Sequence, residues 1–184
     1  FGGRFMLAVF ALLTIYLIYF FTLRLFKNEE LSLNSVFISI STILLIFGAR
    51  GMNTDIFLLF FISFSLFSYV IYLKEDKLQY IYLFWFNLSM AMLVKGPVPL
   101  IIITLILCSY HLLPGERLKF RKLYFFRGFL IFSIINFPWY LYILNTLPGL
   151  LHYFIYDQLL SRLGKSGQGH PRPFDYFLYI FPLL

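Results

Sequence analysis

The residues with the clearest chemical potential are a few charged side chains that border long apolar runs. Arg50 and Asp55 precede one run, Lys95 separates two others, and Arg162 and Arg172 lie in a polar stretch near the C-terminus. A lysine ammonium binds phosphate as a compact point charge, and a carboxylate can accept a proton or stabilise positive charge. Together they predict a cavity for an anionic, phospholipid-like substrate with a polar head.

Each of these residues also has a structural interpretation. Asn53 or Thr54 can cap a helix that starts near Ile56, and Asp55 in its first turn is favoured by the helix dipole. Arg50 can simply pair with Asp55. The Lys95-Gly96-Pro97 stretch has the composition of a tight turn between two helices.

Aromatic and imidazole side chains extend the set of candidates. Pro138-Trp139-Tyr140 lies inside an apolar run, where the proline predicts a kink and the aromatic rings suit a membrane interface. His170 is notable for its basic neighbours, whereas His152 is expected to be a solvated loop residue. Three His and one Cys, with no metal-ligand spacing, give no zinc motif. Any cofactor, including a divalent cation in the full-length protein, stays open.

The elements that must position these residues are membrane helices. Hydrophobic residues make up 61% of the 184 residues and charged residues 12%, against about 45–50% and 25% in soluble domains. The apolar runs approach the roughly 20 residues that cross a bilayer as a helix. We therefore expect an all-α, polytopic transmembrane bundle forming one domain over residues 1–184, truncated at both ends.

Six complete spans and the start of a seventh near Tyr176 are predicted. They are Phe5–Leu23, Leu33–Phe47, Ile56–Leu73, Leu78–Val94, Val98–Leu113 and Phe125–Leu144.

The lysines and arginines indicate which side of the membrane each loop occupies. Nine of the fifteen fall in or next to loops 24–32, 74–77 and 114–124, which the positive-inside bias makes cytoplasmic. The net charge of +7 comes mostly from these flanks, so it does not indicate nucleic-acid binding. The loops that hold Asp55 and Lys95 then face outwards, on the periplasmic or extracellular side of an inner membrane.

The last outer loop, residues 148–175, is long enough to suggest a function. Its first half, Leu150–Leu160, repeats apolar residues at helical spacing and predicts an interfacial amphipathic helix. Its second half, 164–171, contains three glycines and predicts a mobile or ligand-ordered loop.

The order of these motifs resembles a known family. Ala49-Arg50-x4-Asp55, Lys95-Gly96-Pro97, Pro138-Trp139-Tyr140, Arg162 and His170-x2-Pro173 occur in this order ahead of Tyr176. The chain is similar in this respect to the aminoarabinose transferase and protein mannosyltransferase group, integral-membrane glycosyltransferases of GT-C fold. It would lack the first span and the first outer loop of that group.

The resemblance implies transfer of a sugar from a polyprenyl-phosphate donor to a lipid, protein or glycan acceptor at the extracytoplasmic face. Asp55 and His170 would be the catalytic residues, Asp55 as the second acidic residue of the site and His170 by shaping the outer loop over the substrate. Lys95 and Arg162 would hold the donor phosphate. Arg50 and Tyr140 complete the expected substrate-binding set. The main catalytic carboxylate belongs to the absent loop, so the fragment itself is expected to be inactive.

Two other classes of protein compete with a transferase. A transporter or flippase for a lipid-linked or anionic substrate would also have charges among proline-broken spans, but it would place them near the membrane midplane and show internal repeats. A membrane scaffold would tolerate alanine at Asp55, Lys95 and His170.

Overall fold

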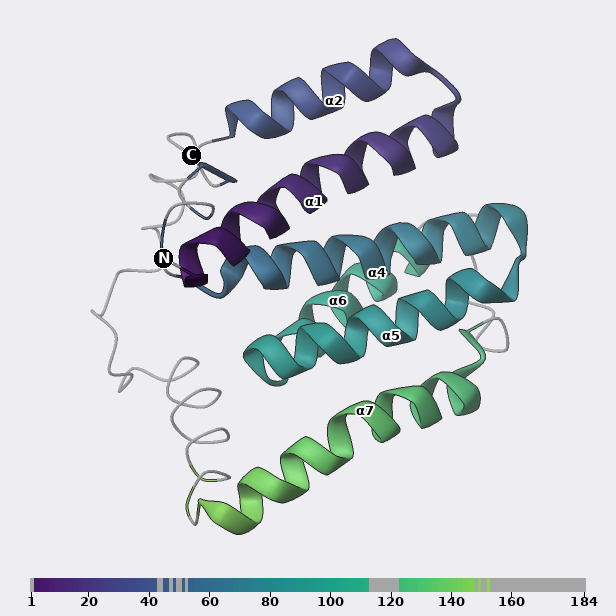
Figure 1. The fold of residues 1–184 in the computed structure, drawn as a ribbon. Coiled ribbons are helices and arrows are strands. Elements are labelled where there is room, and N and C mark those ends of the chain that lie inside the picture. The colour runs from purple at the N-terminus through teal and green to yellow at the C-terminus, as the bar shows by residue number, and fades with distance from the viewer. Residues whose placement is uncertain are drawn as a thin grey trace. The chain divides into compact units, whose positions relative to one another are not determined.

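The computed structural model describes residues 2–42, 45–46, 48, 51, 53–112, 123–147, 149 and 152. Within them the named helices, in chain order, are α1 (Gly2–Phe26), α2 (Glu29–Ser41), α4 (Asp55–Glu75), α5 (Leu78–Lys95), α6 (Val98–Leu112) and α7 (Phe125–Thr146) (Figure 1). The described residues include no strand. This part of the chain therefore confirms the predicted all-helical class.

The chain divides into two compact units, residues 1–136 and 137–184. The first unit holds α1, α2, α4, α5, α6 and the N-terminal half of α7. The described part of the second unit is the remainder of α7 with residues 147, 149 and 152. That residues 1–184 form a single domain stays a prediction.

Among the described residues, three helices are long and apolar enough to cross a membrane, namely Arg4–Phe26, Asp55–Glu75 and Phe125–Thr146. Helices α5 and α6 have 18 and 15 residues, somewhat fewer than the roughly 20 that span a hydrocarbon core. The structure therefore supports a membrane helical bundle, while six complete spans stay a prediction.

The predicted span Leu33–Phe47 is not one continuous helix, which corrects the sequence analysis. Helix α2 begins earlier, where Asn28 accepts a 3.1 Å hydrogen bond from the Leu31 amide, and it ends at Ser41 because Thr42 adopts an extended conformation with ψ 119°. The Ser41 and Thr42 hydroxyls donate to the Ile38 carbonyl. Such side-chain bonds compete with the regular helix ladder and favour its interruption.

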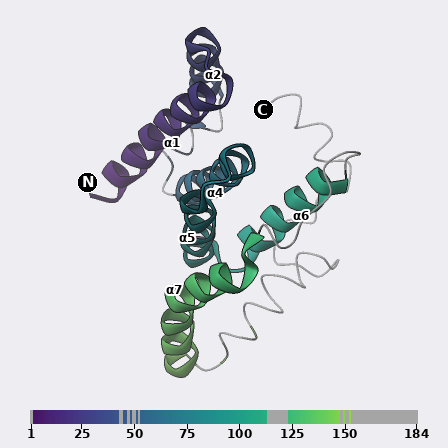
Figure 2. The same cartoon turned by 90° about the vertical axis from the view of Figure 1, so that its right-hand side faces the viewer.

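The first unit is built from helix pairs. Helices α1 and α2 form one pair and α4 and α5 another, and α1 also packs against α4 (Figure 2). Phenylalanine rings make much of the α1–α4 contact: the ring of Phe10 meets Phe57 edge to face at 4.6 Å, and Phe21 stacks on Phe67 at 5.1 Å. Edge-to-face and offset contacts of this kind add stability beyond their buried area.

The α4–α5 pair contains the best buried core. Tyr72, Ile81 and Phe84 are at most 1% exposed, and the Ser65 hydroxyl on α4 donates to the Phe84 carbonyl on α5 at 3.0 Å. Ser65 itself is completely buried. Small side chains let membrane helices approach closely, and a hydroxyl bond between helices adds to the contact. These features fix α4 against α5.

An ionic cluster closes the loop end of this pair. Arg24 at the end of α1 makes a two-pronged ion pair with Glu75 at 2.8 and 3.0 Å, and Lys77 reaches the same carboxylate at 2.9 Å. The Arg24 guanidinium also lies 5.2 Å from the centre of the Tyr80 ring, and Lys74 donates to the Leu25 carbonyl. Arg24 and Lys77, which count towards the positive-inside bias, therefore also form ion pairs that connect α1, α4 and the start of α5.

The start of α7 is held by a tryptophan. The Trp85 indole N–H on α5 donates to the Leu123 carbonyl at 3.0 Å, and its ring meets Phe125 edge to face. Gly128 lies directly against this ring, since an added Cβ there would be 1.9 Å from Trp85 Nε1. The contact therefore requires glycine at position 128.

We predict that Gly128→Ala lowers the thermal unfolding midpoint of the full-length protein in detergent. The new methyl group must displace Trp85 or α7, and overpacking of this kind typically costs about 1–3 kcal/mol. Gly48→Ala is the matched control, because its Cβ would meet Ile56 Cδ1 at an ordinary 3.6 Å. Equal midpoints for the two variants would contradict the tight Trp85–Gly128 contact.

We also predict that Glu75→Gln lowers this midpoint at low ionic strength. The substitution keeps the side-chain size but removes the charge that attracts Arg24 and Lys77. Because dissolved salt screens partly exposed charges, the gap between variant and wild type should narrow as salt is raised. A gap that does not change with salt would mean that packing, and not the ion pairs, accounts for the loss.

Candidate functional site

The antiparallel α4–α5 pair brings two predicted site residues to one end. Asp55 is the first residue of α4 and Lys95 is the last residue of α5, so the two lie 40 positions apart in the chain. The loop that joins the helices contains Asp76 and Lys77 and lies at the opposite end. A carboxylate and an ammonium group from two different loops therefore meet at one end of the α4–α5 pair, opposite the end that holds the Arg24–Glu75 ion pair.

Asp55 and Lys95 form an ion pair. Lys95 Nζ donates to Asp55 Oδ1, and Asn53 Nδ2 donates to Asp55 Oδ2, so each carboxylate oxygen has a donor. The side chains keep 36% and 44% of their surface exposed for Lys95 and Asp55 respectively. A ligand can therefore reach both charges without unfolding either helix.

Backbone dipoles favour both charges where they stand. Asp55 occupies the first turn of α4, where partial positive charge gathers, and Lys95 occupies the last turn of α5, where partial negative charge gathers.

Neither Asn53 nor Thr54 forms the side-chain cap that was predicted for the start of α4. Thr54 makes no side-chain cap hydrogen bond, and the Asn53 amide bonds the Asp55 carboxylate. Asn53 is thus a site residue that was predicted only as a helix cap. The one feature of the sequence that could have indicated its contact with the carboxylate is its position two residues before Asp55.

The turn after Lys95 is rigidly built. Gly96 has φ 66° and ψ −143°, a combination that residues with a Cβ rarely adopt. Its amide donates to the Met92 carbonyl at 2.8 Å, and the Pro97 carbonyl accepts from Ile101 at 3.3 Å at the start of α6. The Lys95 backbone is consequently held between two helix ends.

The other predicted site residues are not described together with this pair. Arg50, Arg162 and His170 lie outside the described residues, as does most of the 148–175 loop. Tyr140 is half-buried on α7 within the second unit, so it is described separately from the ion pair. Their roles stay predictions.

The arrangement suits recognition of a charged group that also carries a hydroxyl. The Lys95 ammonium has three N–H donors, of which one bonds Asp55. The other two N–H groups can donate to phosphate oxygens. Asp55 can accept a hydroxyl proton or hydrogen bond beside it. Among the described residues, no group of three or more His, Cys, Asp and Glu side chains is placed to hold a metal ion.

Comparison with known proteins gives this geometry a context. The sequence model of the dolichyl-phosphate-mannose-protein mannosyltransferase family matches residues 1–142, which include Asp55, Lys95 and Tyr140. An uncharacterized protein of Aquifex aeolicus (strain VF5) is 30% identical over 146 residues, covering 77% of this chain and 28% of that relative. The chain thus spans less than a third of the relative's length. No solved structure gives a significant match.

The family match covers well over half of the chain and agrees with the expected resemblance. The chain therefore belongs to the dolichyl-phosphate-mannose-protein mannosyltransferase family, whose members are membrane glycosyltransferases of the GT-C type.

Proposed function

We propose that the full-length protein transfers a sugar from a polyprenyl-phosphate donor to a lipid, protein or glycan acceptor at the extracytoplasmic face of a bacterial inner membrane. The observation that carries this proposal is the exposed Asp55–Lys95 pair at one end of the α4–α5 pair. Family membership supports the reaction class, because the family uses a polyprenyl-phosphate sugar donor.

Lys95 would bind the donor phosphate. In the transfer, the bond between the sugar's anomeric carbon and the phosphate oxygen breaks, and the acceptor oxygen forms the new bond to that carbon. Negative charge grows on the departing polyprenyl phosphate, and a fixed ammonium beside it lowers the energy of that state. The acceptor's proton passes to a general base, which the family resemblance places in the first outer loop.

Asp55 would serve as a second acidic residue that positions Lys95 and the acceptor side of the substrate. An exposed ion pair contributes only about 0–1 kcal/mol, and both partners here are more than a third exposed. A phosphate can therefore take over part of the lysine's hydrogen bonding at little cost. Asn53 holds the second carboxylate oxygen while this exchange occurs.

The charge distribution supports an outward-facing site. Arg24, Lys74 and Lys77 gather at the far end of the α4–α5 pair, which the positive-inside bias assigns to the cytoplasm. The Asp55–Lys95 end then faces outwards, where lipid-linked sugars would be used.

We predict that Asp55→Asn and Lys95→Ala each lower kcat/KM for transfer of labelled sugar at least about 100-fold, the usual effect of losing a group that stabilises transition-state charge. Asp76→Asn and Lys77→Ala are matched controls, since they make the same substitutions at the other end of α4 and in the adjacent loop. All four proteins should show wild-type expression and elution from size-exclusion chromatography.

Two results would contradict this role for the pair. Unchanged turnover in both site variants would reduce Asp55 and Lys95 to a structural ion pair. Equal losses in the site variants and in the controls would mean that folding, and not the site, is affected.

The sidedness is tested separately by cysteine labelling. We predict that an impermeant maleimide labels Thr54→Cys in right-side-out vesicles, but labels Lys77→Cys only after permeabilisation. Thr54 is exposed and makes no side-chain cap bond, and the Lys77 side chain is 58% exposed, so an aqueous reagent can reach a cysteine at either position. The background carries Cys108→Ser. The reverse pattern would place the ion pair on the cytoplasmic side.

A further inference from the structure

The start of α7 carries a basic side chain that the candidate site does not use. Arg127 lies in the first turn of α7 and is exposed. Its Nη1 group donates to the Tyr82 hydroxyl on α5 at 3.4 Å. Arg127 takes part in none of the ion pairs found among the described residues. Its positive charge therefore has no carboxylate partner in this part of the chain.

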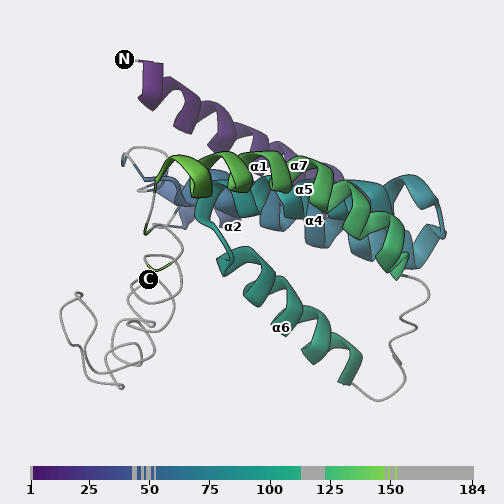
Figure 3. The same ribbon diagram turned by 90° about the horizontal axis from the view of Figure 1, so that it is seen from below.

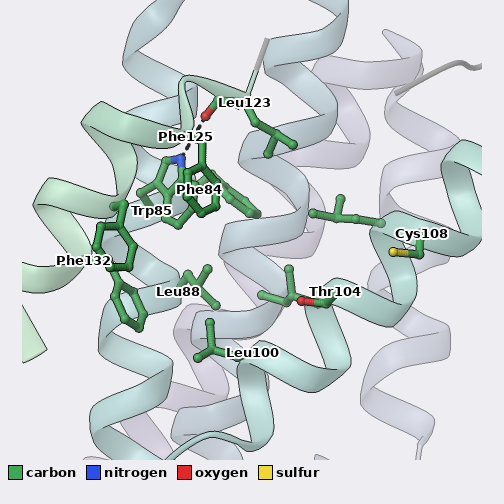
Figure 4. A pocket seen from close by; sticks show the side chains of 12 residues that line it. Phe84, Trp85, Leu88, Leu100, Thr104, Cys108, Leu123, Phe125 and Phe132 are labelled. Atoms are coloured by element: carbon green, nitrogen blue, oxygen red, sulfur yellow. Dashed lines mark hydrogen bonds between the residues drawn. The ribbon is translucent and has the colours of Figure 1, made fainter. Parts of the chain in front are cut away.

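The contact between Arg127 and Tyr82 is separate from the apolar packing of the α5–α7 junction. Figure 3 shows α6 leaving the α4–α5 pair at an angle, and an apolar cavity of about 320 Å³ lies between α5, α6 and α7. Trp85, Leu123 and Phe125 lie on the cavity wall, where the indole N–H donates to the Leu123 carbonyl (Figure 4). Neither Arg127 nor Tyr82 lines this cavity.

The two side chains offer neighbouring hydrogen-bond donors. A guanidinium has five N–H donors, and one of those of Arg127 bonds Tyr82. Because the Tyr82 oxygen accepts this bond, the hydroxyl hydrogen is directed elsewhere and can be donated to a third group. A phosphate fits a charged, planar fork beside a hydroxyl, since arginine binds phosphate oxygens in a bidentate manner.

The position of Arg127 on a membrane helix indicates where such a phosphate comes from. Helix α7 is long and apolar enough to cross a membrane, and Arg127 is two residues from its start. Leu130 and Ile134 follow Arg127 by three and seven residues, so they share its face of the helix. They are 55% and 64% exposed. A phosphate at Arg127 therefore has exposed apolar surface beside it, as the head of a phospholipid requires.

The charge at this end of the bundle favours an anionic lipid. Tyr82 lies four residues after the start of α5, at the end where Arg24, Lys74 and Lys77 gather and which the proposed orientation makes cytoplasmic. Residues 117–122, which precede α7 in the sequence, add four bases. Basic clusters immediately cytoplasmic of a membrane helix are typical of segments that bind anionic lipids.

We propose that Arg127 and Tyr82 bind the phosphate of an anionic glycerophospholipid of the cytoplasmic leaflet, with the acyl chains against Leu130 and Ile134. The lipid connects α5 to α7 at this end, beside the Trp85 contact. The leaflet follows from the proposed orientation, which the labelling of Lys77→Cys tests. The site itself does not depend on sugar transfer.

Lipid affinity measured by native mass spectrometry tests the proposal. The full-length protein is delipidated in detergent and titrated with phosphatidylglycerol or with phosphatidylcholine of the same acyl chains. Arg127→Gln should lower the affinity for phosphatidylglycerol about tenfold, which corresponds to about 1.4 kcal/mol. Tyr82→Phe should lower it several-fold, because it removes the hydroxyl donor alone. Affinity for phosphatidylcholine should not change, since its choline cation opposes the guanidinium.

Lys27→Gln is the matched control. Lys27 is exposed at the same end of the bundle, just after α1, and the substitution removes the same charge. It should change the affinity for phosphatidylglycerol less than twofold. Arg127→Lys keeps the charge but lacks the planar fork, so it should recover only part of the loss seen in Arg127→Gln.

Three results would overturn the proposal. Equal affinities of wild type, Arg127→Gln and Tyr82→Phe for phosphatidylglycerol would exclude the site. An equal loss in Lys27→Gln and Arg127→Gln would mean that general surface charge attracts the lipid. Displacement of the lipid by inorganic phosphate at equal concentration would assign the pair to a soluble anion. Should Arg127→Gln fail to elute as wild type from size-exclusion chromatography, Tyr82→Phe decides. Lipid binding without any sugar transfer would refute the proposed function alone.

Discussion

The packing of α4 against α5 is the contact on which the candidate site depends. Ser65 and the buried Phe84 bring the two helices close together, and a hydroxyl-to-carbonyl bond joins them. In an antiparallel pair, the start of one helix must lie beside the end of the other. Asp55 and Lys95 meet for that reason alone, although 40 residues separate them. No loop conformation is needed to bring them together.

The two ends of this pair carry different kinds of ionic contact. At the loop end, Arg24, Glu75 and Lys77 join three elements and satisfy each other's charges. At the other end, Lys95 and Asp55 form a smaller pair beside a fixed turn, with much of each side chain open. Arg24 and Glu75 join α1 to α4 with side chains that are 32% and 24% exposed, whereas Lys95 and Asp55, at 36% and 44%, leave more of their surface open to a ligand.

Part of this arrangement could be predicted from the sequence and part could not. Long apolar runs predict helices because a backbone inside a bilayer must satisfy its own hydrogen bonds. Asp55 and Lys95 could be predicted as site residues because they are charged residues at the ends of such runs. The end of α2 before Thr42 was not predicted. The span was predicted from hydropathy, and a hydrogen bond from a Ser or Thr hydroxyl to a backbone carbonyl does not change the hydropathy of the sequence. The hydrogen bond from Asn53 to Asp55 was not predicted either, because an asparagine just before a helix looks the same in the sequence whether it caps the helix or bonds a carboxylate.

The sequence by itself determined the helical class, the family and the residues worth testing, because these follow from composition, apolar run length and motif order along the chain. Only the tertiary structure decided that Lys95 pairs with Asp55, that Trp85 requires glycine at position 128, and that α6 diverges to leave an apolar cavity. Each of these depends on distances between helices. Such distances are set by side chains packing across elements far apart in the chain, and no local pattern records them.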